Sequence, residues 1–142
     1  MSIDKRTKKY KNINNRIDKF LELCEEKKIL ARRDWSDCNT CGNAEIETER
    51  KEIEAKYPLQ QYIAYVFYHG QEADRIKEVI KDNNYMACDI YLNWGYFDEK
   101  KESKDPDGKK LAEIIHKIAI DNGYELDYSD IYQKLLLHID IK

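Results

Sequence analysis

The sequence predicts an α/β fold, at the border with α+β, built on a single mixed sheet of four strands. Three observations lead to this expectation. A chain of 142 residues suits one domain. Two helical patterns occupy residues 1–57, and extended and helical patterns then alternate over residues 58–142. We therefore expect one domain over 1–142, with an N-terminal helical part at 1–57 and a β-α-β-α-β-β part at 58–142.

The N-terminal part is expected to hold two helices. The first runs from about residue 7 to residue 30, because Ile13, Ile17 and Cys24 belong to an apolar stripe at helical spacing. An irregular stretch follows. The second helix spans 43–57, is mostly charged, and ends before Pro58.

The remaining segments supply the sheet. Residues 62–68 form a continuous apolar and aromatic run, which is typical of a central strand covered on both faces. The expected helices cover 71–81 and 109–122, and the other expected strands cover 88–94, 124–128 and 134–141. Two right-handed β-α-β crossovers and a C-terminal hairpin would connect the four strands. Asp105 or Asp107 is expected to cap the last helix and Asn122–Gly123 to stop it.

Charge and hydropathy narrow the classes of partner. Residues 1–33 carry 11 Lys/Arg against 5 Asp/Glu, a net of +6, whereas the rest carries 14 against 23, a net of −9. The acidic remainder opposes a phosphate backbone, so we do not expect nucleic-acid binding. The sequence shows neither a membrane-spanning run nor a secretory signal, and a cytoplasmic location is expected.

Cys38 and Cys41 form the one short motif with a chemical meaning, Cys-x-x-Cys-Gly. Three interpretations stay open. The pair could supply two zinc ligands, although zinc usually takes four and no second such motif exists. It could be a redox pair at a helix start. It could also be plain structure, in which Trp35 and the two cysteines fill the joint between the first two helices.

A second candidate site lies at the end of the predicted central strand. His69 follows that strand and precedes a helix, with Asp74 nearby, and Asn93 and Trp94 end the neighbouring strand. Ligands of open α/β sheets bind beyond the carboxyl ends of strands, so these four residues could line a cleft. A lone histidine can equally cap a strand. Near the C-terminus, His138 shares the outward face of the last strand with Lys134 and Asp140. Exposure of this face to solvent accounts for these polar residues as well as a catalytic role would.

The central part of the chain resembles a family of small bacterial proteins of unknown function. The matching elements are Ala31-Arg-Arg-Asp-Trp-Ser-Asp-Cys-Asn-Thr-Cys-Gly42, then Tyr65-Val-Phe-Tyr-His-Gly70 with Asp74, then Ile90-Tyr-Leu-Asn-Trp-Gly95. The resemblance implies that Trp35, Cys38, Cys41 and His69 belong to a recurring pattern. It implies no reaction.

These observations favour a non-enzymatic interaction or regulatory module, of the immunity-protein or accessory type, with another protein as its partner. The sequence contains no nucleophile–base pair, phosphate loop or complete metal set that would indicate an enzyme. Two alternatives remain: a zinc- or thiol-dependent protein that uses Cys38 and Cys41, and a small-molecule-binding domain or enzyme with a cleft at His69.

Overall fold

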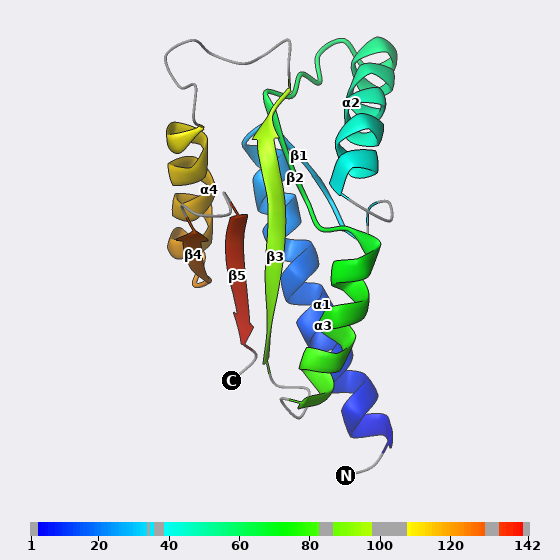
Figure 1. The fold of residues 1–142 in the computed structure, drawn as a ribbon, viewed down its shortest axis with the longest axis vertical. Coiled ribbons are helices and arrows are strands. Elements are labelled where there is room, and N and C mark those ends of the chain that lie inside the picture. The colour runs from blue at the N-terminus through cyan, green and yellow to red at the C-terminus, as the bar shows by residue number, and fades with distance from the viewer. Residues whose placement is uncertain are drawn as a thin grey trace.

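A computed structural model shows four helices and one five-stranded mixed sheet (Figure 1). It describes residues 3–33, 35, 39–82, 87–97, 108–129 and 134–140, with the backbone alone for 3–7, 10, 39–41, 43, 128, 129 and 134. The helices are α1 (Ile3–Glu26), α2 (Asn39–Lys56), α3 (Gly70–Asp82) and α4 (Lys109–Asp121). The strands are β1 (Ile29–Arg32), β2 (Ala64–Phe67), β3 (Ala87–Tyr96), β4 (Glu125–Ser129) and β5 (Lys134–Asp140). The α/β class is confirmed.

The expected count of four strands is wrong because a further strand, β1, begins within the last residues of the expected first helix. The chain leaves α1 through Lys28, whose φ of 65° is left-handed and incompatible with a continuing helix. The next three residues, Ile29, Leu30 and Ala31, are all buried. Three consecutive buried residues do not fit one face of a surface helix, but they suit a short strand covered on both sides.

The strand order is β1-β2-β3-β5-β4. The expected central strand is confirmed, since β2 lies between β1 and β3, although it is shorter than the aromatic run of 62–68. The C-terminal hairpin of β4 and β5 is also confirmed. The crossover expected between 62–68 and 88–94 is wrong, because β2 and β3 are antiparallel. A parallel connection instead joins β1 to β2 through α2.

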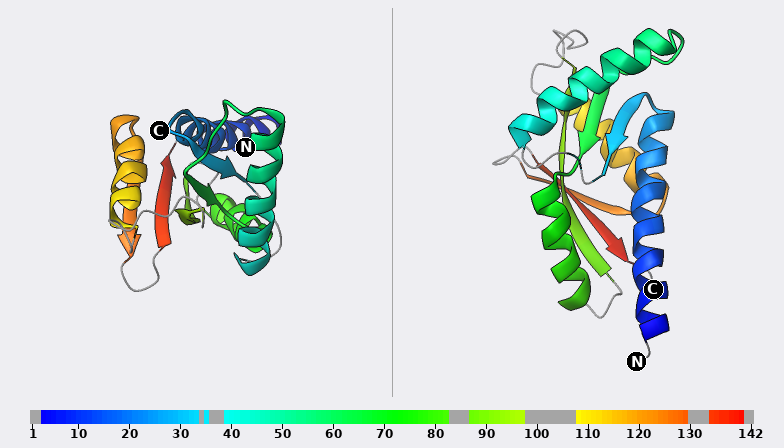
Figure 2. Two further views of the ribbon diagram at one scale, coloured as in Figure 1. Left: turned by 90° about the horizontal axis from the view of Figure 1, so that it is seen from above. Right: turned by 90° about the vertical axis from the view of Figure 1, so that its right-hand side faces the viewer.

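Two apolar cores hold the layers together. The larger core gathers α1 and α4 over one face of the sheet, with Phe20, Leu92 and Ile115 among its buried members. The smaller core packs Ile46 of α2 onto Leu30 and Phe67, on the other face of β1 and β2. The views in Figure 2 show α1 and α3 on opposite sides of the sheet.

β3 is much longer than β2, and this difference determines where α3 lies. β2 pairs only with the second half of β3, from Asn93 to Tyr96. α3 lies beside the first half, below β2 in Figure 1. Ile76 and Ile80 anchor α3 to the larger core.

The ends of α4 differ in part from expectation. Gly108, in a left-handed conformation with φ 70°, occupies the N-cap without a side-chain hydrogen bond. Asp105 and Asp107 lie outside the described residues. The stop at Asn122–Gly123 is confirmed, because the Asn122 N–H donates to Ala119 O and Gly123 adopts φ 82°. None of the described helices is both long and apolar enough to cross a membrane.

Candidate functional site

The Cys-x-x-Cys-Gly motif lies where the chain enters α2. Cys38 lies outside the described residues, and Cys41 is described only as backbone in the first turn of α2. Their use as zinc ligands, redox pair or packing groups therefore stays a prediction. The flanking residues of the motif have structural roles: the Trp35 indole N–H donates to Gly42 O at 3.2 Å, and Trp35 packs against the smaller core.

His69 caps a helix. Its Nδ1 accepts a hydrogen bond from the Glu72 backbone N–H at 3.1 Å, and its carbonyl accepts one from Ala73 N at 3.0 Å. The Glu72 N–H belongs to the first turn of α3, where N–H groups lack helical partners, and the Ala73 bond to the His69 carbonyl is the first i→i−4 bond of the helix. This geometry gives His69 a structural task and explains its place between a strand and a helix.

The other residues expected at a His69 cleft are placed apart from one another. Asp74 is exposed on α3. Asn93 and Trp94 are consecutive in β3, so their side chains leave opposite faces of the sheet. Trp94 packs against the larger core. The cleft stays a prediction, and the structure does not bring its four residues onto one face.

Cys24 and Cys88 are buried members of the larger core. Burial raises the pKa of the Cys24 thiol to about 12, and the neighbouring Glu25 carboxylate adds to the effect. Burial, with a further contribution from Asp89, raises the pKa of Cys88 to about 12 as well. A thiol with such a pKa stays protonated near neutral pH and is therefore a poor nucleophile. These two cysteines act as small apolar side chains.

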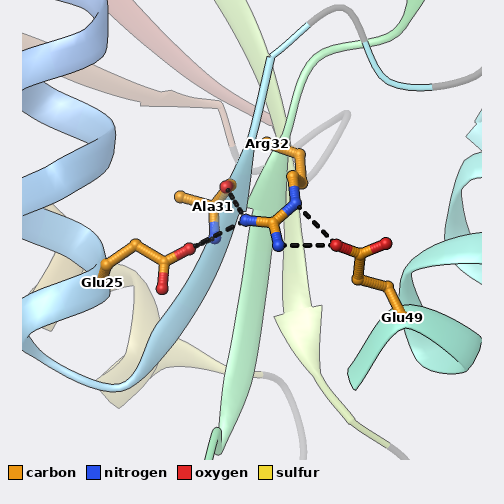
Figure 3. A network of polar contacts seen from close by, with 4 residues as sticks. All are labelled: Glu25, Ala31, Arg32 and Glu49. Atoms are coloured by element: carbon orange, nitrogen blue, oxygen red, sulfur yellow. Dashed lines mark hydrogen bonds and ion pairs between the residues drawn. The ribbon is translucent and has the colours of Figure 1, made fainter. Parts of the chain in front are cut away.

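A polar network closes the outer edge of β1 (Figure 3). A Glu25 carboxylate oxygen accepts hydrogen bonds from the Ala31 N–H at 3.0 Å and from Arg32 Nη1 at 3.1 Å. Arg32 Nη1 also donates to Ala31 O at 2.8 Å. On its other side, Arg32 donates to Glu49 of α2 through Nη2 at 2.7 Å and Nε at 3.2 Å.

The network satisfies both backbone groups that Ala31 turns away from β2. Those groups would otherwise form an open strand edge able to pair with another chain. The same Arg32 guanidinium joins the end of α1 to the middle of α2. Tyr62 belongs to this network, because burial and then a hydrogen bond to Glu25 raise the pKa of its hydroxyl to about 12. At Ala31, these contacts occupy the backbone groups that a partner strand would otherwise use.

The face of β3, β5 and β4 that points away from α1 and α4 has a different character. In Figure 1 this face is turned to the viewer, with α1 behind the sheet. Cross-strand pairs arrange its side chains in two rows. One row is Asp89, His138 and Glu125, and the other is Tyr91, Leu136 and Asp127. We call these six residues the open face.

The open face combines apolar and acidic groups in contact with solvent. Tyr91 is 40% exposed and Leu136 is half-buried. His138 Nε2 lies 2.7 Å from Asp127 Oδ2, so the carboxylate fixes the orientation of the imidazole. At the margin, Arg75 of α3 donates to Asp89 O at 2.8 Å and lies over the Tyr91 ring at 5.1 Å.

A hollow of about 510 Å³ lies at the end of the open face, where β3 begins and β5 ends. Its lining includes Asp89, Glu125, His138 and Asp140, together with Arg16 of α1. The alternation along 134–141 predicts that His138 and Asp140 share a solvent-facing side of their strand. That Glu125 and Asp127 of β4 lie beside them depends on the pairing of β4 with β5, which neither strand predicts alone.

On the open face, Asp127 holds the His138 imidazole, and a histidine held by an aspartate is the orienting half of a general-base arrangement. Cys88 is the thiol nearest in sequence to this face, and its side chain points into the larger core. Among the described residues, no three His, Cys, Asp or Glu side chains are arranged to hold a metal ion.

The chain belongs to the family described as a domain of unknown function (DUF6891), whose model matches residues 5–134. The expected resemblance to a family of unknown function is confirmed at that level, while the motifs assigned to it and its bacterial origin stay predictions. No curated protein matches the chain. No solved structure matches it either.

Proposed function

We propose that this chain is a non-enzymatic interaction module that binds a positively charged surface of another protein through the open face. The observation that carries the proposal is the arrangement of the open face: Tyr91, Leu136 and His138 lie side by side, and carboxylates surround them. An exposed aromatic ring with an aliphatic neighbour provides the apolar centre of an interface, and charged groups around it provide the rim.

Charge determines the kind of partner. Asp89, Glu125, Asp127 and Asp140 place four carboxylates on or beside the open face. Arg75 offsets only part of this charge, at 3.5 Å from Asp89 Oδ1. A partner rich in Lys or Arg would complement the face, associate faster because of electrostatic attraction, and bind more weakly at high salt.

The two alternative functions remain open to direct tests. A zinc- or thiol-dependent function would use Cys38 and Cys41, and elemental analysis of protein purified without added metal separates it from the module. A small-molecule function at His69 would need Asp74 and Asn93 to reach one ligand, and the helix-capping geometry of His69 gives it no support.

The experiment compares variants of the open face with matched controls. Partners that co-purify from cells of the source organism are reconstituted as purified pairs, and binding is measured by calorimetry at low and high salt. Tyr91→Ala and Asp127→Lys are expected to weaken binding by about tenfold or more, the effect of removing a residue central to an interface. Tyr57→Ala and Glu52→Lys change an exposed tyrosine and an exposed carboxylate elsewhere and should leave the affinity unchanged.

Binding that the control variants weaken as much as the open-face variants would reject the proposal. So would a purified complex whose affinity does not depend on salt, because the acidic frame would then have no role.

A further inference from the structure

A groove of about 570 Å³ runs between α1 and α4, on the side of the sheet opposite the open face. Its apolar lining comes from Leu23 on α1 and from Ile114 and Ile118 on α4. Ile118 reaches the larger core and is 5% exposed, whereas Ile114 is 41% exposed. An isoleucine so exposed, beside a half-buried leucine, forms an apolar strip that the rest of the described chain does not cover.

The charges along the groove are balanced. Lys27 and Lys117 contribute two cations, and Glu26 and Asp121 contribute two anions. Each side of the groove therefore carries one group of each sign, with Lys27 in the turn directly after α1. A strongly basic or strongly acidic partner would gain from half of these groups and be repelled by the other half, in contrast to the open face, where four carboxylates outnumber Arg75.

Balanced charge around an apolar strip is the pattern expected of a self-complementary surface. In a two-fold contact the same patch is used twice, so each copy presents cations to the anions of the other. The apolar side chains of two facing α4 helices would meet along the axis, and each α4 would enter the α1–α4 groove of its partner, as amphipathic helices enter grooves in other complexes.

We infer that this groove is a two-fold interface between two copies of the chain. The apolar strip holds only Leu23, Ile114 and Ile118, so we expect a weak dimer that depends on protein concentration. The inference goes beyond the proposed function. It concerns the opposite side of the molecule, and it leaves the open face of each copy exposed.

The test is sedimentation equilibrium of the full chain over micromolar to millimolar concentrations. The wild-type protein is expected to approach the mass of a dimer as the concentration rises. Ile114→Lys is expected to reduce the association constant by about tenfold or more, because it places a charge in the apolar strip. Ile120→Lys is the matched control: Ile120 is 49% exposed on the same helix but does not line the groove, so its substitution should leave association unchanged.

A second pair of variants tests the charge argument. Lys117→Glu should weaken association, and adding Asp121→Lys in the same chain should restore it, because the double variant again carries both signs. Circular dichroism confirms that each variant is folded. A wild-type protein that stays monomeric at millimolar concentration overturns the inference, and so does equal disruption by Ile114→Lys and Ile120→Lys. Neither result affects binding of a basic partner at the open face.

Discussion

At Gly42 the backbone of α2 comes into contact with the Phe67 ring. A Cβ at this position would lie 2.7 Å from Phe67 Cε2, closer than two carbon atoms can approach without displacement. Phe67 is fully buried, so its ring has little room to move. The glycine of the Cys-x-x-Cys-Gly motif is thus explained by packing, and together with Trp35 it supports a structural role for the ends of the motif.

Gly42→Ala is therefore expected to destabilise the fold by about 1–3 kcal/mol, the usual cost of overpacking a core. Urea denaturation followed by circular dichroism measures the change. Ala gains helix propensity over Gly, which on its own would stabilise α2 by about 1 kcal/mol. An unchanged or increased free energy of unfolding would show that Phe67 yields and that the close approach has no energetic weight.

His138 shows what the sequence can and cannot predict about a single residue. Alternation along 134–141 predicts correctly that its side chain leaves the core face of the strand. Its contact with Asp127 depends on the register of β4 against β5, and a shift of one residue would move the carboxylate to the other face. Register is a property of the folded pair, so the histidine–aspartate contact could not be derived from either strand alone.

At the scale of elements, Arg32 connects three of them. It donates from β1 to Glu25 at the end of α1 and to Glu49 on α2, and all three side chains are about seven-tenths buried. Loss of the guanidinium would remove the donor of Glu49 and of the Ala31 carbonyl, and it would leave Glu25 without its cation.

Arg32→Ala is expected to lower the free energy of unfolding by about 1–3 kcal/mol. Asp18→Ala is the control, because it removes a more exposed ion pair, that of Asp18 with Arg33, and exposed pairs contribute less than about 1 kcal/mol. A double-mutant cycle with Glu49→Ala isolates the coupling between β1 and α2. Equal effects of Arg32→Ala and Asp18→Ala would mean that burial adds nothing to the network.

The elements differ in how well local sequence predicts them. α4 and the central position of β2 follow from helical spacing and from a run of strand-forming residues. β1 does not, because its four residues continue the apolar content of α1 and only the left-handed turn at Lys28 separates them. The direction of β3 was also missed: a helix between two strands favours a parallel pair, and the antiparallel pairing depends on where α3 packs.

The whole molecule has two sides of opposite character. The open face presents carboxylates around an aromatic residue, and the α1–α4 groove presents balanced charges around an isoleucine. If both proposals hold, a dimer displays two open faces at once. A partner with repeated basic sites would then bind more tightly than a single face allows, without any additional contact.

Stability at alkaline pH is also a property of the whole fold, since its buried acids come from α1, β3 and the segment before β2. The pKa values of Cys24, Cys88 and Tyr62 are each raised to about 12 by burial. An unfolded chain releases these protons near pH 9–10, whereas the native protein retains them until about pH 12. The unfolded state therefore binds fewer protons in this window, and the free energy of unfolding must fall as the pH rises.

We expect the free energy of unfolding to be level below about pH 8.5 and to decline from there to pH 12, by up to about 1.4 kcal/mol per pH unit for each group. Tyr62→Phe tests the contribution of the Tyr62 hydroxyl to this decline. At pH 8 it should reduce stability by about 1 kcal/mol through loss of the hydrogen bond to Glu25. Above pH 10 its decline should be shallower than that of the wild-type protein, because one titrating group is gone. Urea titrations at half-unit intervals of pH measure both curves. If the free energy of unfolding falls equally steeply with pH in both proteins, the raised pKa of Tyr62 is contradicted. If that of the wild-type protein stays level to pH 11, the raised pKa values of Cys24, Cys88 and Tyr62 are all contradicted.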